Sequence, residues 1–152
     1  MKTINLILIG AVLAMFASCG GGEAKQEGPA AKPESMVKKT PSGPDKGVGL
    51  IKSIDLPATI DEALAATGME TFEAKCTACH KMGKRFVGPD LTGVIDRREP
   101  EWIMNMILDP ELMVKENEAA RQLLMEYSAP MANQSLTEEE ARGILEYFRT
   151  IK

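Results

Sequence analysis

A five-residue stretch in the middle of the chain, Cys76-Thr77-Ala78-Cys79-His80, most strongly constrains what this sequence folds around. Two thiols three residues apart and an adjoining imidazole form the pattern C-x-x-C-H. At this spacing each thiol can add to one vinyl group of a porphyrin, which brings the histidine against the iron. The stretch therefore predicts one covalently attached haem, held by Cys76 and Cys79, with His80 as an iron ligand.

Three other interpretations of the stretch were compared with this one. A structural zinc site needs four Cys or His ligands, but His80 is the only histidine and the third cysteine, Cys19, is assigned to lipidation, as described below. A thioredoxin-like dithiol would follow a strand, whereas the residues before Cys76 have helical periodicity. The third interpretation is a pair of inert buried cysteines. The residues that flank the stretch favour haem attachment over all three.

The composition agrees with a cofactor-centred domain. The 152 residues are enough for one domain with additional segments, and aromatic residues make up only 5% of them. A small domain with so few aromatic side chains gains from a large apolar cofactor in its core. The formal net charge of −4, from 18 basic and 22 acidic residues, disfavours nucleic-acid binding.

Residues 1–18 have the features of an export signal. Lys2 supplies the positive start, an apolar run follows, and small residues precede Cys19. The run is too short to span a bilayer, which takes about 20 apolar residues. Phe16-Ala17-Ser18-Cys19 resembles a bacterial lipoprotein cleavage site, although Phe16 stands where leucine is usual. We therefore expect Cys19 to be lipidated on the periplasmic side of the cell envelope, with a soluble exported protein as the alternative.

Residues 19–57 have the composition of a flexible linker between this leader and a domain over residues 58–152. The segment contains a triple glycine, five prolines and mixed charges. Its last part carries a small apolar group, and the sequence leaves open whether this group docks onto the domain or forms a short strand-like arm. The group consists of Val48, Leu50, Ile51, Ile54 and Leu56.

Apolar residues at helical spacing predict helices over residues 61–75, 100–107, 109–127 and 137–151. Thr137 and Glu140 form a capping box at the start of the last helix. Gly68, within the first helix, disfavours helix formation by about 1 kcal/mol relative to alanine, so it is expected to allow close approach of another helix. The glycine-rich segment 81–94 is predicted to be a loop.

Short motifs follow one another through the second half of the chain. They are Gly68-x-x-x-Phe72, Cys76-x-x-Cys79-His80, Gly88-Pro89-Asp90-Leu91, Met131, Leu136-Thr137-x-x-Glu140 and Ile144-x-x-Tyr147. From residue 68 to residue 151 the pattern resembles a class I cytochrome c domain. The resemblance implies an all-α fold of about four to five helices around one covalently bound haem c.

The resemblance also implies specific contacts. The first and last helices are expected to cross nearly at right angles. The contact residues at this crossing would be Gly68, Phe72, Ile144 and Tyr147. The carbonyl of Pro89 would accept a hydrogen bond from His80 and so fix the ring and raise its basicity.

The second axial iron ligand has to be a methionine or a lysine, because the chain has no second histidine. The family places its ligand in a loop before the last helix, which corresponds to Met131. The family usually has proline just after this methionine, whereas here Pro130 precedes Met131 and Ala132 follows it. The other methionines considered lie in helical patterns and are interpreted as core residues. They are Met104, Met106, Met113 and Met125.

Two groups of charged residues lie near these motifs. Lys81, Lys84 and Arg85 either steer an acidic partner to the exposed haem edge or form an ordinary solvated loop. A second group is predicted to pair with the haem propionates, with Trp102 equally interpretable as a core residue. It consists of Arg97, Arg98 and Trp102.

These observations favour a membrane-tethered, single-haem electron carrier with His/Met ligation, which is not itself an enzyme. The alternative is a haem-based sensor or a catalytic subunit of a redox enzyme, in which the distal ligand dissociates. A haem-free interaction lipoprotein is a third hypothesis. For the carrier, the expected partners are a quinol-oxidising complex as donor and a terminal oxidase or a nitrogen-oxide reductase as acceptor.

Overall fold

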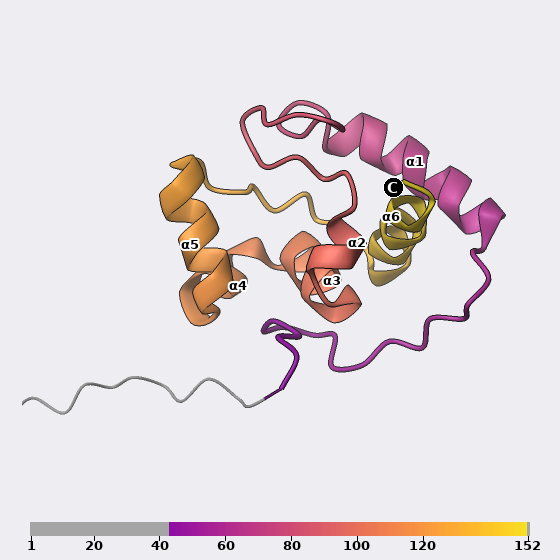
Figure 1. Ribbon diagram of the computed structural model, residues 1–152, viewed down its shortest axis with the longest axis horizontal. Helices are drawn as coiled ribbons and strands as arrows, with labels where there is room; N and C mark the ends of the chain where they lie inside the picture. The colour runs from indigo at the N-terminus through magenta and orange to yellow at the C-terminus, as the bar shows by residue number, and fades with distance from the viewer. Residues whose placement is uncertain (1–42, 152) are drawn as a thin grey trace, which may run out of the picture. The chain divides into compact units, whose positions relative to one another are not determined.

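The structure, a computed structural model, describes residues 43–151, and all regular secondary structure in that range is α-helical (Figure 1). The leader, Cys19 and the linker up to residue 42 lie outside the described residues. The all-α prediction is confirmed, but six helices replace the expected four to five. They are α1 (Glu62–Lys75), α2 (Val94–Arg97), α3 (Pro100–Leu108), α4 (Pro110–Glu116), α5 (Glu118–Tyr127) and α6 (Glu138–Thr150).

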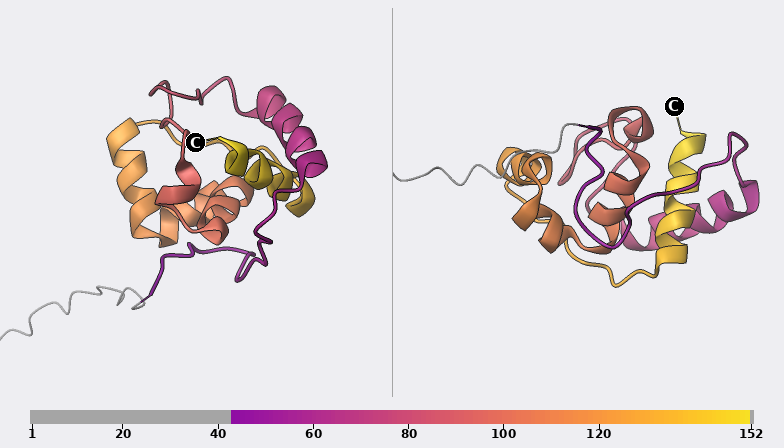
Figure 2. Two further views of the ribbon diagram at one scale, coloured as in Figure 1. Left: turned by 45° about the vertical axis from the view of Figure 1, so that its right-hand side comes forward. Right: turned by 90° about the horizontal axis from the view of Figure 1, so that it is seen from below.

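Helices α1 and α6 cross steeply and form the most extensive helix contact of the described unit (Figures 1 and 2). A glycine from each helix makes the crossing so close. A Cβ atom on Gly68 would lie 1.9 Å from the carbonyl oxygen of Gly143, so no side chain fits there. Beside it, the Phe72 ring lies 5.5 Å from the Tyr147 ring, centroid to centroid. The expected meeting of the first and last helices is therefore confirmed.

Side-chain caps determine where the C-terminal helices begin. At α6 the predicted capping box is present: Glu140 N–H donates to Thr137 Oγ1 at 3.2 Å, and Thr137 N–H donates to Glu140 Oε2 at 2.7 Å. The prediction of one helix over residues 109–127 is wrong. Asn117 has an extended backbone that ends α4, and its side chain accepts a hydrogen bond from Ala120 N–H and so caps α5.

Residues 45–57, which we call the strap, pack along the helical unit (Figures 1 and 2). Ile51 is 7% exposed and belongs to the core. The Asn105 side chain accepts from Ile51 N–H at 2.9 Å and donates to the carbonyls of Ile51 at 2.9 Å and Lys46 at 3.1 Å. The apolar group left open by the sequence therefore docks, except for Leu50, which is 72% exposed. Residues 45–57 belong with the domain and do not form a free linker.

The end of the strap is fixed to α6 by two arginines. Arg142 donates to the Asp55 carbonyl at 3.3 Å, and Arg149 donates to the Pro57 carbonyl at 2.6 Å. Both arginines also bind the carboxylate of Glu146, which is 1% exposed. A buried carboxylate with two guanidinium partners is fully paired, so this cluster ties the strap to the last helix.

Candidate functional site

The two cysteines and the histidine follow directly from the end of α1. Cys76 caps α1 by donating its N–H to the Phe72 carbonyl at 2.8 Å, and the next turn closes with His80 N–H donating to the Cys76 carbonyl at 2.9 Å. Both cysteines are free thiols, half-buried at Cys76 and exposed at Cys79. Burial, together with the neighbouring Cys79, raises the pKa of the Cys76 thiol to about 11. The thiols and the imidazole all lie at the edge of one cavity.

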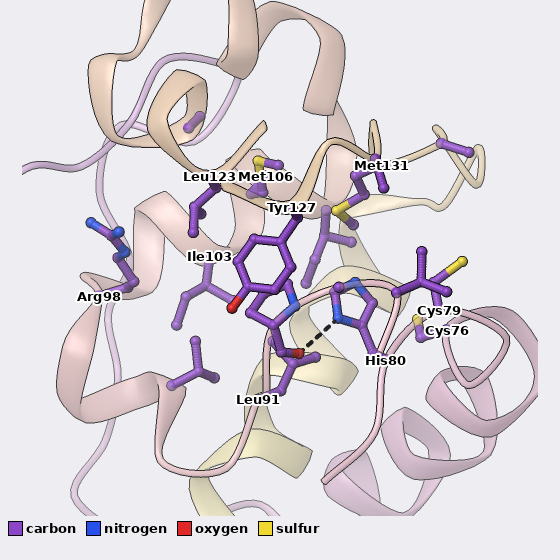
Figure 3. A pocket seen from close by; sticks show the side chains of 18 of the residues that line it. Cys76, Cys79, His80, Leu91, Arg98, Ile103, Met106, Leu123, Tyr127 and Met131 are labelled. Atoms are coloured by element: carbon purple, nitrogen blue, oxygen red, sulfur yellow. Dashed lines mark hydrogen bonds between the residues drawn. The ribbon is translucent and has the colours of Figure 1, made fainter. Parts of the chain in front are cut away.

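His80 is held by the loop that follows it. Its Nδ1 lies 3.3 Å from the carbonyl oxygen of Pro89 (Figure 3), so the predicted hydrogen bond is confirmed. With its proton on Nδ1, the ring presents the lone pair of Nε2 to a metal. Burial lowers the pKa of His80, against a smaller opposing effect of the Pro89 hydrogen bond. The neutral form that binds iron is thus favoured.

Gly88 makes the approach of this loop to His80 geometrically feasible. A Cβ atom on Gly88 would lie 2.5 Å from Cε1 of the His80 ring. Its N–H donates to the Cys79 carbonyl at 2.9 Å, which returns the loop to the cysteine turn. The loop predicted over residues 81–94 is present, except that its end begins the short helix α2 at Val94.

A cavity of about 740 Å³ opens in front of His80. This volume is within the usual range for cofactor pockets, which is roughly 300–1,000 Å³. Its wall is mostly apolar and comes from all six helices and from the loops on either side of α2 and after α5. A large, flat, apolar group attached at Cys76 and Cys79 therefore fits the residues present.

Two methionines line this cavity. Met131, in the loop after α5, is half-buried and lies across the cavity from His80, whereas Met106 of α3 lies farther along the wall beside Leu123 (Figure 3). Met104 and Met113 are buried in the core as predicted and do not line the cavity. The interpretation of Met125 as a core residue is wrong, because its side chain is 68% exposed.

The three residues expected near the haem propionates all line the cavity, but two have their donors engaged. The Arg97 guanidinium donates to the carbonyls of Asp90 and Thr92. The Trp102 indole N–H donates to Asn117 Oδ1 at 3.2 Å. The Arg98 guanidinium lies over the Trp102 ring, 4.6 Å from its centroid, and within residues 43–151 this guanidinium has no hydrogen-bond partner.

Arg85 and Lys81, two of the basic residues that follow the cysteines, differ in their contacts. Arg85 stacks on Tyr127 at 4.0 Å and donates to the carbonyl oxygen of Glu126 at 3.0 Å and to its carboxylate at 3.2 Å. It therefore links the cysteine loop to the end of α5. Lys81 lies 5.3 Å from the centroid of the exposed Phe86 ring.

Several residues that shape the site were not identified from the sequence. Gly143 at the helix crossing has no periodic signal of its own. Asn105 and Asn117 are buried polar residues, 1% and 8% exposed. An asparagine inside an apolar helix pattern, and another just before Glu118 in a long predicted helix, were signals that could have indicated a buried polar contact and a helix start.

Two features were searched for in the described residues: a cluster of metal ligands and a helix able to cross a membrane. In the part of the chain that the structure describes, no group of three or more His, Cys, Asp or Glu residues is arranged to hold a metal ion. Within residues 43–151 no helix has both the length and the apolar character needed to cross a bilayer.

The comparisons with known proteins agree with this site. The family described as cytochrome c matches residues 65–152. A solved cytochrome c from Rhodothermus marinus is 44% identical, with a TM-score of 0.66, covering 67% of this chain and 88% of that one. An engineered form bound to a carbene intermediate is 44% identical, with a TM-score of 0.63 and the same coverage of both chains.

A cytochrome c domain from Pseudomonas putida is 27% identical, with a TM-score of 0.51, covering 55% of this chain and 85% of that one. No curated protein sequence matches the chain. The family match spans more than half of the chain and contains the C-x-x-C-H stretch and the cavity in front of it. The chain therefore belongs to the cytochrome c family and binds one haem c covalently through Cys76 and Cys79.

Proposed function

We propose that this protein is an exported, lipid-tethered carrier that transfers single electrons, with the haem iron ligated by His80 and Met131. Electron transfer is the function that membership of the family implies. When bound, the haem supplies a one-electron Fe(III)/Fe(II) couple. The observation that carries the proposal is the placement of His80 and Met131 on facing sides of one cavity.

The residues of this chain support such a role in three ways. His80 is fixed by Pro89 in the orientation and protonation state that bind iron. The apolar cavity wall excludes water, which limits reorganisation when the charge of the iron changes. A thioether from Met131 is a soft, neutral ligand that favours the reduced state relative to a second histidine.

For docking, we propose that Lys81 and Lys84 face an acidic redox partner, with the exposed Phe86 and Val87 supplying apolar contact. Arg85 is already engaged with Tyr127 and Glu126. The proposed donor is a quinol-oxidising complex, and the proposed acceptor is a terminal oxidase or a nitrogen-oxide reductase. Tethering through Cys19, with residues 20–42 as the linker, would keep the carrier beside such membrane complexes.

Carbon monoxide tests the carrier proposal directly. It is added to the reduced full-length holoprotein while the Soret band is recorded. If Met131 closes the sixth position, the band stays unchanged on the timescale of mixing. A fast and complete shift would instead show a readily vacated distal position.

That second outcome would favour the haem-based sensor or catalytic subunit. One observation makes this alternative worth testing: the engineered Rhodothermus marinus relative holds a carbene intermediate. Measuring the carbon monoxide on-rate over a range of concentrations separates the two. A rate that saturates at the rate of Met131 dissociation still indicates a closed resting site, whereas a linear rise indicates an open one.

A further inference from the structure

The wall of the haem cavity made by α3 is contacted from behind by the strap. Three polar side chains on this outer side are nearly inaccessible: Glu101, Asn105 and Asn117 are 5%, 1% and 8% exposed. Buried polar groups are stable only when they are hydrogen-bonded. Each of these three has a partner in residues 45–54 of the strap.

Asn117 differs from the other two because it also contacts a residue that lines the cavity. Its Nδ2 donates to both carboxylate oxygens of Asp45, at 2.8 and 3.1 Å. Its Oδ1 accepts from the Trp102 indole N–H at 3.2 Å and from Ala120 N–H at 3.0 Å. A carboxylate only accepts, and an indole or backbone N–H only donates. One orientation of the Asn117 amide therefore satisfies all four contacts, and Asp45 is the strap residue that holds its donor side.

Trp102 transmits this orientation to the cavity. Its ring is 4% exposed and lines the cavity, and the Arg98 guanidinium lies over the ring. Arg98 lines the cavity too, and it shares with Asp45 a second hollow of about 250 Å³ on the outside of the wall. Unlike the guanidinium of Arg97, that of Arg98 has unused donors and is able to pair with a carboxylate of the porphyrin.

We propose that the strap residue Asp45, acting through the Asn117 amide, positions the Trp102 indole and the Arg98 guanidinium in the wall of the haem cavity. Asp45 lies outside the region that matches the family, residues 65–152. The strap thereby becomes part of the haem site of this protein. The inference does not depend on Met131 ligation or on the lipid tether.

A purely structural strap is the competing explanation, and the other strap contacts allow the two to be separated. Lys46 Nζ contacts Glu101 Oε1 at 2.8 Å and touches neither Trp102 nor Asn117. Lys46→Met therefore weakens the strap without changing the hydrogen bonds of Asn117. Asp45→Ala removes the acceptor of Asn117 and that of the Gly47 N–H within the strap, and it leaves the Lys46 and Asn105 contacts in place.

The test uses the full-length, reduced holoprotein labelled with ¹⁵N. The chain has one tryptophan, so a single indole N–H signal reports on the Trp102 hydrogen bond. Hydrogen exchange of this signal is expected to accelerate about tenfold in Asp45→Ala, the effect of weakening one buried hydrogen bond. In Lys46→Met, the exchange rate of the Trp102 indole proton should not change once the change in global stability is taken into account. Unchanged exchange in Asp45→Ala, or equal acceleration in both variants, would overturn the proposal.

Exchanging the two side chains provides a rescue. In the double substitution Asp45→Asn with Asn117→Asp, the carboxylate still accepts from Trp102 and Ala120, and the amide now donates from the strap. In this variant the Trp102 indole proton is expected to exchange at the wild-type rate. In Asn117→Ser it is expected to exchange fast, because serine keeps a helix cap but is too short to bridge Asp45 and Trp102. Fast exchange in the double variant would contradict the proposal, even if Asp45→Ala yielded no holoprotein.

The reduction potential tests whether the effect reaches Arg98. Arg98→Gln is expected to lower the potential in the wild-type background, because a positive charge near the haem carboxylates is lost. The same substitution should have a clearly smaller effect in Asp45→Ala. Each shift in potential is measured against its own background, so the direct effect of the Asp45 charge on the potential cancels. Equal shifts in both backgrounds would therefore show that Asp45 does not position Arg98.

Discussion

At the scale of single residues, the site depends on a few atoms placed against His80. Pro89 fixes one side of the ring, Gly88 allows the loop to come close, and Met131 lies on the opposite side of the cavity. The chain has ten methionines, but among the described residues only Met106 and Met131 line the cavity. For the proposed methionine ligation, the cavity therefore offers a testable pair of residues.

The first prediction compares these two methionines. Met131→Leu should leave the haem attached but remove the charge-transfer absorption of sulfur-ligated ferric haem. The potential should fall by on the order of 0.1 V, because harder donors such as water stabilise ferric iron. Met106→Leu is the matched control and should keep both the absorption and the potential, with a stability loss below about 1.5 kcal/mol. The reverse pattern would assign the ligand to α3.

The second prediction concerns Gly88. Gly88→Ala introduces a Cβ atom 2.5 Å from the His80 ring, so either the ring or the loop has to move. The yield of holoprotein with a six-coordinate haem should drop severalfold, measured as haem per polypeptide. Gly83→Ala is the control: its φ of +74° strains the backbone, but nothing lies within 4 Å of the new atom. Similar losses in both variants would attribute the effect to general loop strain.

At the scale of secondary-structure elements, the steep crossing of α1 and α6 fixes the end of α1 from which the cysteines emerge. The contact is asymmetric. A Cβ atom on Gly68 would overlap the backbone of Gly143, whereas a Cβ atom on Gly143 would lie 3.3 Å from Gly68 Cα. The backbone of α6 cannot yield without displacing Ile144 and Phe148 from the core.

The third prediction follows from this asymmetry. Gly68→Ala should reduce the free energy of unfolding by about 3 kcal/mol, because overlap with backbone outweighs the ~1 kcal/mol gained in helix propensity. Gly143→Ala should cost about 1 kcal/mol or less, since a shift of a few tenths of an ångström relieves its contact. Denaturant unfolding of the ferric holoprotein measures both. Equal losses would mean that the helices separate freely at the crossing.

Local sequence signals account for the elements that were predicted correctly. The box of Thr137 and Glu140 and the C-x-x-C-H stretch are formed by neighbours in the chain, so short patterns revealed them. The sequence left the docking of the strap undecided because Ile51 is bonded to Asn105, which lies 54 positions away, and no periodicity encodes such a contact. The break at Asn117 was missed because apolar spacing continues through it and only the cap signals the new helix.

Among the site residues, too, those with a local sequence signal were predicted, whereas the long-range contacts were not. Cys76, Cys79 and His80 were predicted from their spacing, and they lie together at the cavity as expected. Arg98 was also predicted to lie near the haem, but its stacking on Trp102 and the hydrogen bonds of Asn117 to Trp102 and Asp45 are contacts between distant parts of the chain. Such contacts form only after the chain has folded, so single-sequence patterns could not reveal them.

At the scale of the whole molecule, the domain has to be related to the envelope in which the proposed carrier works. The proposed anchor is Cys19, which lies outside the described residues. None of the helices within residues 43–151 is a candidate for crossing a bilayer. In the proposal, membrane association depends on lipidation of Cys19.

The fourth prediction tests this dependence. Cys19→Ala should move the holoprotein from the membrane fraction to the soluble exported fraction, because the tether would consist of acyl chains. Haem staining of fractionated cells measures the distribution. Ala17→Gly serves as a control that keeps the cysteine and should remain in the membrane fraction. If the Cys19→Ala protein stays in the pellet and resists high salt, an uncleaved leader holds it there.

Docking of the strap shortens the peptide segment between the proposed anchor, Cys19, and the folded unit. With the chain held from Asp45 onward, about 25 residues instead of about 38 separate Cys19 from the folded unit. Even fully extended, about 25 residues span no more than roughly 90 Å, compared with roughly 135 Å for the longer segment. With the proposed anchor at Cys19, the docked strap would therefore reduce the distance that the haem can move from the membrane. The local concentration of the haem beside the proposed membrane-bound partners would then be higher.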